Sequence, residues 1–282
     1  MNAQTIVVTR PTGQARQLIE QLTASLKQGQ ADLPQILSLP LLTIVPKGAE
    51  SDGAQVDPLA RSIDKALQDA DLTIFVSPNA IECTMRLLGK SWQDIAKQII
   101  PIGVMGGSSK LALQHHGIGL EVNPTPVLIP KKNEDWDSEG LWQTLQSLNW
   151  DWSKRKVLIF KGEGGRDWLA DTLRSAGANV EAISVYTRVP LNGDNPAWKA
   201  IEQIDLSQSL WLLTSSEAVR HLGKLMQEQF TETLLYASAI CPHQNIGEAA
   251  KAVGFGKVFI CEPGDEALIQ ASQVWLSLNS SQ

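Results

Sequence analysis

The sequence predicts an α/β protein of two similar domains, each a parallel sheet with helices on both faces. Short apolar runs alternate with helical patterns along the chain, which is the order of parallel strands joined by helices. That order also repeats, because the loops that begin at 77 and 214 lie 137 positions apart. A chain of 282 residues is long enough for two domains, since single cores stop growing near ~250–300 residues.

Composition indicates a globular protein without a nucleic-acid partner. Hydrophobic residues make up 43% and charged residues 19%, as in ordinary globular domains. The net charge of −6 argues against nucleic acid, which requires a broad basic face. No apolar run approaches the ~18 residues of a membrane span, and residues 1–20 lack a signal-peptide core. Cys83, Cys241 and Cys261 have neither metal-ligand nor paired spacing, which fits a reducing compartment. We therefore expect a cytoplasmic protein.

The first half of the chain contains three predicted strand–loop–helix units. Apolar residues at helical spacing follow each strand, and Asp57-Pro58 has the aspartate and proline that favour a helix start. Pro40 interrupts an extended segment, which indicates an edge strand or a crossing linker. The predicted strands are 5–9, 36–45, 72–76 and 100–105, and the predicted helices run from about 15, 58, 79 and 107.

The second half is predicted to contain three further units and one terminal helix. After the irregular segment 123–139, a short helix covers about 141–148, and strands are expected at 157–160, 180–188, 210–213, 237–240 and 257–261. Four tryptophans lie at 136, 142, 150 and 152. A small core beneath a long loop explains them better than a stacking site does.

The stretch 157–189 carries the strongest functional signal. A buried strand leads into the loop that contains Lys161, Gly162 and Arg166, and a helix follows. Backbone N–H groups and cations at a helix start favour an anion. We therefore expect an anionic substrate there and expect Tyr186, on the next strand, to face it. A purely structural role for Tyr186 stays open, because tyrosine is common in strands.

Other motifs are weak. The glycines of the loop at 162–165 lack the G-x-G-x-x-G spacing of dinucleotide sites. The histidines at 115, 116, 221 and 243 lack metal-ligand spacing, so no metal site is predicted. Ser77, Ser215 and Ser216 are interpreted as helix caps, because no G-x-S-x-G motif surrounds them.

An ordered set of motifs resembles the uroporphyrinogen-III synthase family. The set covers nearly the whole chain and comprises VTRP at 8–11, FVSPNAIE at 75–82, the loop 106–109, DSEGL at 137–141, the segment 160–180 and VYTRVP at 185–190. The resemblance implies two flavodoxin-like domains with parallel sheets, joined by a two-stranded hinge. It places 1–38 plus 190–282 in a discontinuous domain 1 and 46–181 in domain 2. The crossing linkers are 39–45 and 182–189, and the strand-end loops of both domains would border one cleft.

The same resemblance implies an activity. Family members are cyclising hydro-lyases that close hydroxymethylbilane, invert ring D and release water, without metal or organic cofactor. We expect a monomer that binds a small-molecule substrate and neither nucleic acid nor membrane. A transient contact with the preceding pathway enzyme is left open.

Residue by residue, the resemblance implies that Tyr186 assists loss of the substrate hydroxyl. Relatives often have threonine where this chain has Ser109, and Gly-Pro-Thr-Thr where it has 241–244. The substrate carries eight carboxylates, and Arg188 adds a further cation near the glycine loop. The substrate-binding residues implied are Arg10, Pro11, Ser77, Asn79, Gly106, Ser108, Ser109, Lys161, Gly162, Arg166, Thr214, Ser215, Ser216, Pro242 and His243.

Two other functions remain open on the sequence. One is a two-lobed small-molecule-binding protein without catalytic activity, against which the missing export signal counts. The other is a nucleotide-dependent enzyme on a flavodoxin-like sheet. Isomer analysis of the cyclised product would test the first, and heat stabilisation by nucleotide would test the second.

Overall fold

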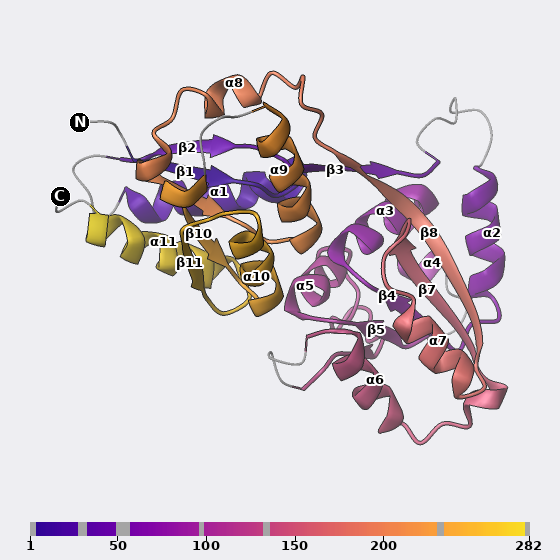
Figure 1. Cartoon of the computed structure of the whole chain (residues 1–282). Coiled ribbons are helices and arrows are strands. Elements are labelled where there is room, and N and C mark those ends of the chain that lie inside the picture. The colour runs from indigo at the N-terminus through magenta and orange to yellow at the C-terminus, as the bar shows by residue number, and fades with distance from the viewer. Residues whose placement is uncertain are drawn as a thin grey trace. The chain divides into compact units, whose positions relative to one another are not determined.

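The computed structural model describes residues 4–27, 33–48, 57–95, 99–131, 136–229 and 234–279. The chain divides into two compact units (Figure 1). Unit 1 comprises 1–43 and 189–282, and unit 2 comprises 44–188. Each unit is an α/β sandwich around one main sheet, so the predicted fold class is confirmed.

Unit 1 contains a five-stranded parallel sheet. The strand order is β11-β10-β9-β1-β2, and the paired strands are in parallel register, with Val7 of β1 opposite Trp211 of β9 and Leu37 of β2. Numbered along unit 1 alone, this is the 2-1-3-4-5 order of flavodoxin-like sheets. The strands are β1 (Thr5–Val8), β2 (Gln35–Ser38), β9 (Ser209–Leu212), β10 (Ser238–Cys241) and β11 (Lys257–Ile260).

The sheet of unit 1 is buried on both faces. Ile6 and Val8 join one apolar core with α1 and α11, whereas Val7 joins the other core with α9 and α10. Alternate residues of one short strand therefore serve different cores, which explains why the strands are continuous apolar runs. The helices are α1 (Thr12–Leu26), α8 (Trp198–Ile201), α9 (Ser216–Gln229), α10 (Gln244–Ala252) and α11 (Asp265–Asn279), with 3₁₀ turns at Leu206–Gln208 and Leu234–Tyr236.

Unit 2 repeats this topology with its strands in a permuted chain order. Its six-stranded sheet has the order β3-β8-β7-β4-β5-β6. If counting starts at β7, the strands β8-β7-β4-β5-β6 again read 2-1-3-4-5. The repeat therefore aligns β7 with β1 and β4 with β9, as the sequence predicts. The strands are β3 (Leu42–Pro46), β4 (Leu72–Phe75), β5 (Ile102–Val104), β6 (Val127–Leu128), β7 (Lys156–Gly162) and β8 (Asn179–Pro190).

Two cores also cover the faces of the unit 2 sheet. Leu158 and Phe160 of β7 pack with α2, α3 and α5, and Phe160 stacks on Phe75 at 5.0 Å between ring centroids. Val157 and Ile159 pack on the opposite face with α6 and α7. The helices are α2 (Pro58–Leu67), α3 (Pro78–Leu88), α4 (Trp92–Ile95), α5 (Gly107–His115), α6 (Ser138–Gln146) and α7 (Trp168–Ser175), with a 3₁₀ turn at Trp152–Lys154.

The two extended segments that connect the units are neighbours. β3 lies beside β8 in the sheet order. The Lys47 N–H donates to the Val185 carbonyl at 2.9 Å, and the Leu191 N–H donates to the Leu41 carbonyl at 2.9 Å. The residue numbers of the bonded partners fall along one segment as they rise along the other, so the two segments are antiparallel. Pro40 lies between β2 and β3, where no ladder N–H is required of it.

Local sequence signals account for several helix starts. The Asp57 carboxylate accepts hydrogen bonds from the N–H groups of Leu59 and Ala60, with Pro58 in the first turn, as predicted. α6 begins earlier than the predicted 141, because Asp137 caps it by accepting from the Gly140 N–H at 2.8 Å. The two-residue strand β6 falls in a segment predicted to be irregular.

Candidate functional site at the strand ends

The carboxyl ends of β4, β5 and β7 in unit 2 meet at one edge of the sheet, because these strands are parallel neighbours. A pocket of about 260 Å³ lies there. It combines an apolar floor with three cationic side chains and the glycine loop after β7. Its lining residues are Val76, Met105, Ser138, Ile159, Lys161, Gly162, Gly164, Gly165, Arg166, Asp167, Leu169, Ala170 and Arg188.

Lys161 and Gly162 belong to strand β7, not to the loop predicted from the sequence. Lys161 pairs with Ser184 of β8, but Gly162 pairs with Tyr186, so β8 has one extra residue at this point. Such a bulge re-aims side chains locally. A Cβ on Gly162 would lie 2.6 Å from the Tyr186 ring and 2.7 Å from an Arg188 nitrogen. Glycine is therefore required here for close approach.

Tyr186 does not present its ring to solvent. Its side chain is only 3% exposed and joins the core of unit 2. Its hydroxyl lies 3.2 Å from the Ser77 Oγ and accepts a 3.4 Å hydrogen bond from Arg188 Nη1. This burial has a packing cause: the ring lies against Gly162 at the bulge, and the Arg188 guanidinium lies 5.8 Å from the ring centroid.

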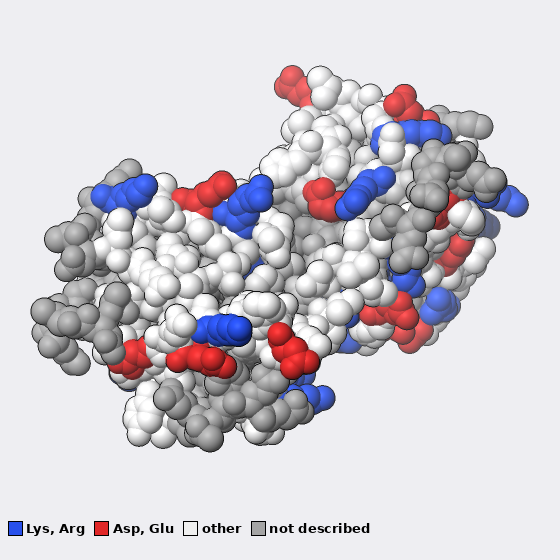
Figure 2. All heavy atoms as spheres, turned by 90° about the horizontal axis from the view of Figure 1, so that it is seen from above, with Lys and Arg blue, Asp and Glu red and all other residues white. Residues whose placement is uncertain are grey.

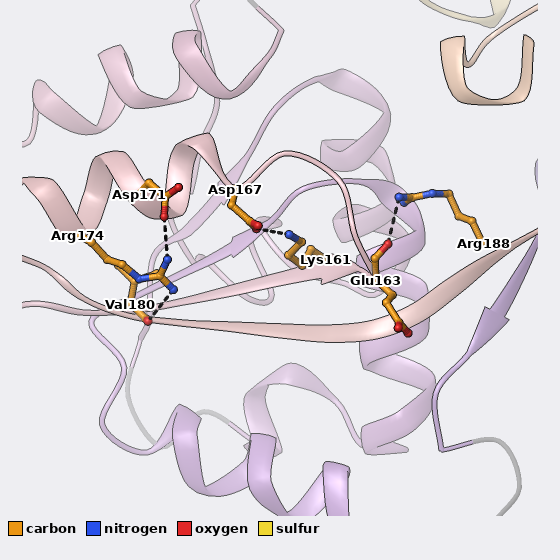
Figure 3. A network of polar contacts seen from close by, with 7 residues as sticks. All are labelled: Lys161, Glu163, Asp167, Asp171, Arg174, Val180 and Arg188. Carbon is orange, nitrogen blue, oxygen red and sulfur yellow. Dashed lines mark hydrogen bonds and ion pairs between the residues drawn. The ribbon is translucent and has the colours of Figure 1, made fainter. Parts of the chain in front are cut away.

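The cations near the pocket are engaged by acids or carbonyls of the same unit, and Figure 3 shows this for Lys161 and Arg188. Lys161 pairs with Asp167, and Arg166 pairs with Glu139. Arg188 Nη2 donates to the Glu163 carbonyl at 3.3 Å, and the Glu163 carboxylate pairs with Lys47 at 3.0 Å. The sequence predicted the cations but not the acids that hold them. An incoming anion must compete with these acids.

The Lys161 ammonium acts on Asp167 mainly through a hydrogen bond and secondly through its charge, and both lower the pKa of that carboxyl. The Asp167 carboxylate thus stays ionised through the neutral range. Asp167 occupies the position before α7, yet its side chain makes no capping hydrogen bond to that helix. The side chain is directed to Lys161 instead (Figure 3).

Ser77 caps α3, as predicted, by accepting from the Ala80 N–H at 3.2 Å. Asn79 is in the first turn of the same helix and is half-buried. The Ser77 hydroxyl therefore has two neighbours, the helix start and the Tyr186 hydroxyl. This arrangement fixes both side chains relative to β4.

At the end of β5, Gly106 and Gly107 lie under the indole of Trp136. A Cβ on Gly107 would come within 2.7 Å of that ring. Ser108 is exposed, whereas Ser109 is buried and only 3% exposed. The hydroxyl that the family motif assigns to Ser109 therefore faces the protein interior, because Ser109 is on the inward side of α5.

The other three tryptophans of the segment 136–152 pack as the sequence predicts. Trp142 and Trp150 lie 5.6 and 5.5 Å from Trp152 between ring centroids, and all three belong to the core beneath α6 and α7. They form a small core and not a stacking site. Trp136 differs, since it covers the glycine turn.

Unit 1 carries a corresponding set of strand-end groups. Arg10, after β1, pairs with Asp265 at 2.6 Å, and Pro11 precedes α1 without a side-chain cap. The Ser215 Oγ accepts from the Ala218 N–H at 3.3 Å, as predicted for a cap. Ser216 is not a cap of this kind, because its hydroxyl donates to the Asn245 carbonyl at 3.2 Å. Thr214 is half-buried beside them.

His243 takes the capping role after β10. Its Nδ1 accepts from the Asn245 N–H at 3.2 Å, and the side chain is exposed. Pro242, before it, is half-buried. His221 and His116 contact the Leu191 carbonyl at 2.7 Å and the Glu82 carboxylate at 3.0 Å. Three of the four histidines thus have a partner within the protein.

No group of three or more His, Cys, Asp or Glu side chains is placed to hold a metal ion within the described ranges. In the same part of the chain, no helix is both long and apolar enough to cross a membrane. On the face in Figure 2, Lys and Arg are interspersed with Asp and Glu. Charges of mixed sign on this face produce no broad field that would attract an anion.

The model of the family described as uroporphyrinogen-III synthase HemD matches residues 20–270. The chain belongs to this family. The uroporphyrinogen-III synthase of Escherichia coli is 25% identical over 274 residues, which cover 95% of this chain and 99% of that protein. The Salmonella typhimurium protein of the same name is 26% identical over the same shares.

Solved structures of family members share the fold. The structure of a mutant uroporphyrinogen III synthase from Thermus thermophilus aligns with a TM-score of 0.57 at 17% identity, covering 99% of this chain and 100% of that one. The Helicobacter pylori uroporphyrinogen-III synthetase aligns with a TM-score of 0.57 at 16% identity, covering 96% and 99%. The family model and the two named relatives confirm the resemblance and the enzyme class predicted from the motifs.

Sequence reasoning missed four residues in or near the pocket of unit 2. Asp167 lines it, Glu139 and Glu163 contact its cations, and Trp136 covers the glycine turn after β5. Asp167 follows the glycine loop directly and Glu139 lies within the DSEGL motif, so both were inside recognised segments. Their pairing with cations could not be read from spacing, because Arg166 and Glu139 are 27 positions apart.

Proposed function

We propose that this chain closes hydroxymethylbilane into uroporphyrinogen III, with inversion of ring D and loss of water. Membership of the family carries the proposal. The groups at the strand ends of unit 2 support it, because cations and backbone donors around an apolar floor suit a pyrrole that bears carboxylates. The strand-end residues that the family resemblance implies are the proposed substrate contacts.

The chemistry needs little from the protein beyond positioning. Loss of hydroxide from the pyrrole carbinol is driven by the electrons of the ring and gives an electrophilic azafulvene. Ring D then attacks through its substituted carbon, and the spiro intermediate reopens and closes again with ring D inverted. Holding the ends of a flexible chain in one geometry supplies most of the rate.

Tyr186 is the proposed proton donor to the departing hydroxide, which leaves as water. Arg188 donates a hydrogen bond to the phenol oxygen, so a positive charge lies beside the oxygen that becomes negative. A positioned acid contributes roughly 10²-fold or more. Tyr186 is 3% exposed, so the carbinol reaches the phenol only after a local rearrangement of the residues that cover it.

The strand-end groups of unit 1 are proposed to bind further carboxylates of the substrate. Arg10 is the cation there, and its pairing with Asp265 resembles the pairing of Lys161 with Asp167 in unit 2. Thr214, Ser215 and His243 offer hydroxyl and imidazole groups at neighbouring strand ends. We further propose that β3 and β8 act as the linkers between a discontinuous domain 1 and domain 2.

We also propose that the protein acts as a monomer in the cytoplasm. The three cysteines are unpaired thiols, which suits a reducing compartment. The proposed reaction needs only a small-molecule substrate. Gel filtration and subcellular fractionation test these two points.

The test is to incubate the protein with freshly prepared hydroxymethylbilane, oxidise the products and separate the uroporphyrin isomers. We expect the inverted isomer to predominate, whereas spontaneous closure in a protein-free control gives the uninverted isomer. A protein that only binds the linear tetrapyrrole would leave the isomer ratio at its spontaneous value, and that result would reject the proposed activity.

A further inference from the structure

The pocket in unit 2 is too small for the whole proposed substrate. Its volume is about 260 Å³, whereas pockets for drug-sized ligands measure ~300–1,000 Å³. The substrate has four pyrrole rings with eight carboxylates, which makes two carboxylates for each ring. The pocket therefore suits one ring with its two acidic side chains.

The lining matches such a ring in chemistry. Val76, Met105, Ile159, Leu169 and Ala170 supply apolar surface, which suits the face of an aromatic ring. The three cations of the pocket, Lys161, Arg166 and Arg188, supply charge for carboxylates.

Two of these cations already hold carboxylates that belong to the protein. Lys161 pairs with Asp167, and Arg166 pairs with Glu139. The Lys161 side chain is 13% exposed but the Asp167 side chain is 59% exposed, so the cation is fixed in the pocket while its acid is at the surface. The acid can therefore leave the pair with little cost in packing.

The position of Asp167 in the chain supports this interpretation. Aspartate directly before a helix ordinarily caps it, yet Asp167 leaves the start of α7 without a side-chain cap. Leu169 and Ala170, in that first turn, line the pocket. The pairing with Lys161 is thus made in place of an ordinary stabilising contact.

We infer that Asp167 and Glu139 occupy the carboxylate positions of one pyrrole ring, and that the two acidic side chains of that ring displace them from Lys161 and Arg166. This inference rests on the proposed function and deepens it. Before binding, the acids keep both cations paired: Lys161 with a largely buried side chain, and Arg166 with a side chain that is 66% exposed. On binding, each cation exchanges one carboxylate for another.

The exchange also provides specificity. A ligand with two carboxylates at the spacing of one ring replaces both internal partners. A monoanion replaces one partner only and leaves the other acid beside it, so like charges repel. Competing internal charges thereby discriminate against wrong ligands.

The probe is a monopyrrole that carries one acetate and one propionate side chain, titrated into the protein by calorimetry. We expect Asp167→Asn and Glu139→Gln each to bind it about two- to fivefold more tightly, the range of a partly exposed ion pair. The double variant should bind most tightly. Lys161→Gln should bind it more weakly than the wild type.

Asp171→Asn is the matched control. It removes one negative charge from the same helix, and Asp171 pairs with Arg174 at 3.0 Å outside the pocket lining (Figure 3). Equal tightening in this variant would show a general charge effect and overturn the inference. Weaker binding by Asp167→Asn would also overturn it, because the acid would then be positioning Lys161 for the ligand.

Absence of binding to the double variant would likewise reject the one-ring pocket. The isomer assay on the wild type separates this failure from failure of the activity. If the wild type forms the inverted isomer but the protein does not bind the monopyrrole, the one-ring inference is refuted and the proposed activity stands. If the protein binds the monopyrrole but the inverted isomer does not form, the proposed activity is refuted and the one-ring pocket stands.

Discussion

The hydroxyl of Tyr186 lies 3.2 Å from the Oγ of Ser77, a residue 109 positions earlier in the chain. Ser77 lies in the short turn between β4 and α3 and caps α3, whereas Tyr186 belongs to β8. The contact brings the proposed acid to a helix start. It also explains why a buried tyrosine keeps its hydroxyl satisfied.

Replacing Tyr186 by phenylalanine tests the role of that hydroxyl. We expect kcat to fall by about 10²-fold, the scale of one positioned acid, and the isomer ratio to stay inverted. Tyr236→Phe is the control, because Tyr236 is the other tyrosine of the chain and is 67% exposed. Full activity in the Tyr186 variant would remove this phenol from the mechanism.

Gly162→Ala tests the close packing beneath the Tyr186 ring. The added Cβ would lie 2.6 Å from that ring, and overpacking of this kind costs ~1–3 kcal/mol of unfolding free energy. We expect a loss of that size in urea denaturation, together with reduced activity. Gly13→Ala is the contrasting variant. Its Cβ meets nothing within 4 Å in α1, so it should stabilise by ~0.5–1 kcal/mol.

The contact of Trp136 with the glycine turn predicts a non-additive pair of variants. Gly107→Ala would bring a Cβ to 2.7 Å from the indole and should destabilise by roughly 1–3 kcal/mol. In Trp136→Ala that obstacle is gone, so adding Gly107→Ala should cost far less. A double-mutant cycle by chemical denaturation measures the coupling. Additive effects would contradict the contact.

The cysteine thiols should react slowly in the folded protein. Burial raises the pKa of Cys83 to about 11 and that of Cys241 to about 12, and it also raises the pKa of Cys261. At pH 8 the thiolate fraction is therefore small. We expect slow labelling by a disulfide reagent, with Cys261 the fastest because it is only half-buried. Denatured protein should label all three rapidly. Fast labelling of native Cys241 would contradict its burial.

Asp151 gives a prediction on acid stability. Its pKa is lowered, first by a hydrogen bond from Lys154 and then by one from Ser153. A lowered folded pKa adds stability above the unfolded value of 3.8, and this contribution is lost as pH falls through the folded value. Wild type should therefore exceed Asp151→Asn in stability at pH 6. The difference should shrink below pH 3.8; a difference that grows with acid would refute the pairing.

Local sequence was sufficient for most secondary structure and for the repeat. Continuous apolar runs such as Val7 between Ile6 and Val8 indicate strands buried on both faces, and both faces are indeed covered. Asp57-Pro58 encodes its own helix start. These signals depend only on neighbouring residues, so they can be recognised without knowledge of the rest of the chain.

The candidate site was predictable only in part. The sequence by itself determined which loops carry cations, serines and glycines, and the motif order determined the family. Tertiary structure decided that Lys161 is on a strand, that Ser109 and Tyr186 are buried, and that Lys161 and Arg166 are held by acids. A β-bulge and an ion pair between distant segments depend on how the strands align, and no local pattern of residues specifies that alignment.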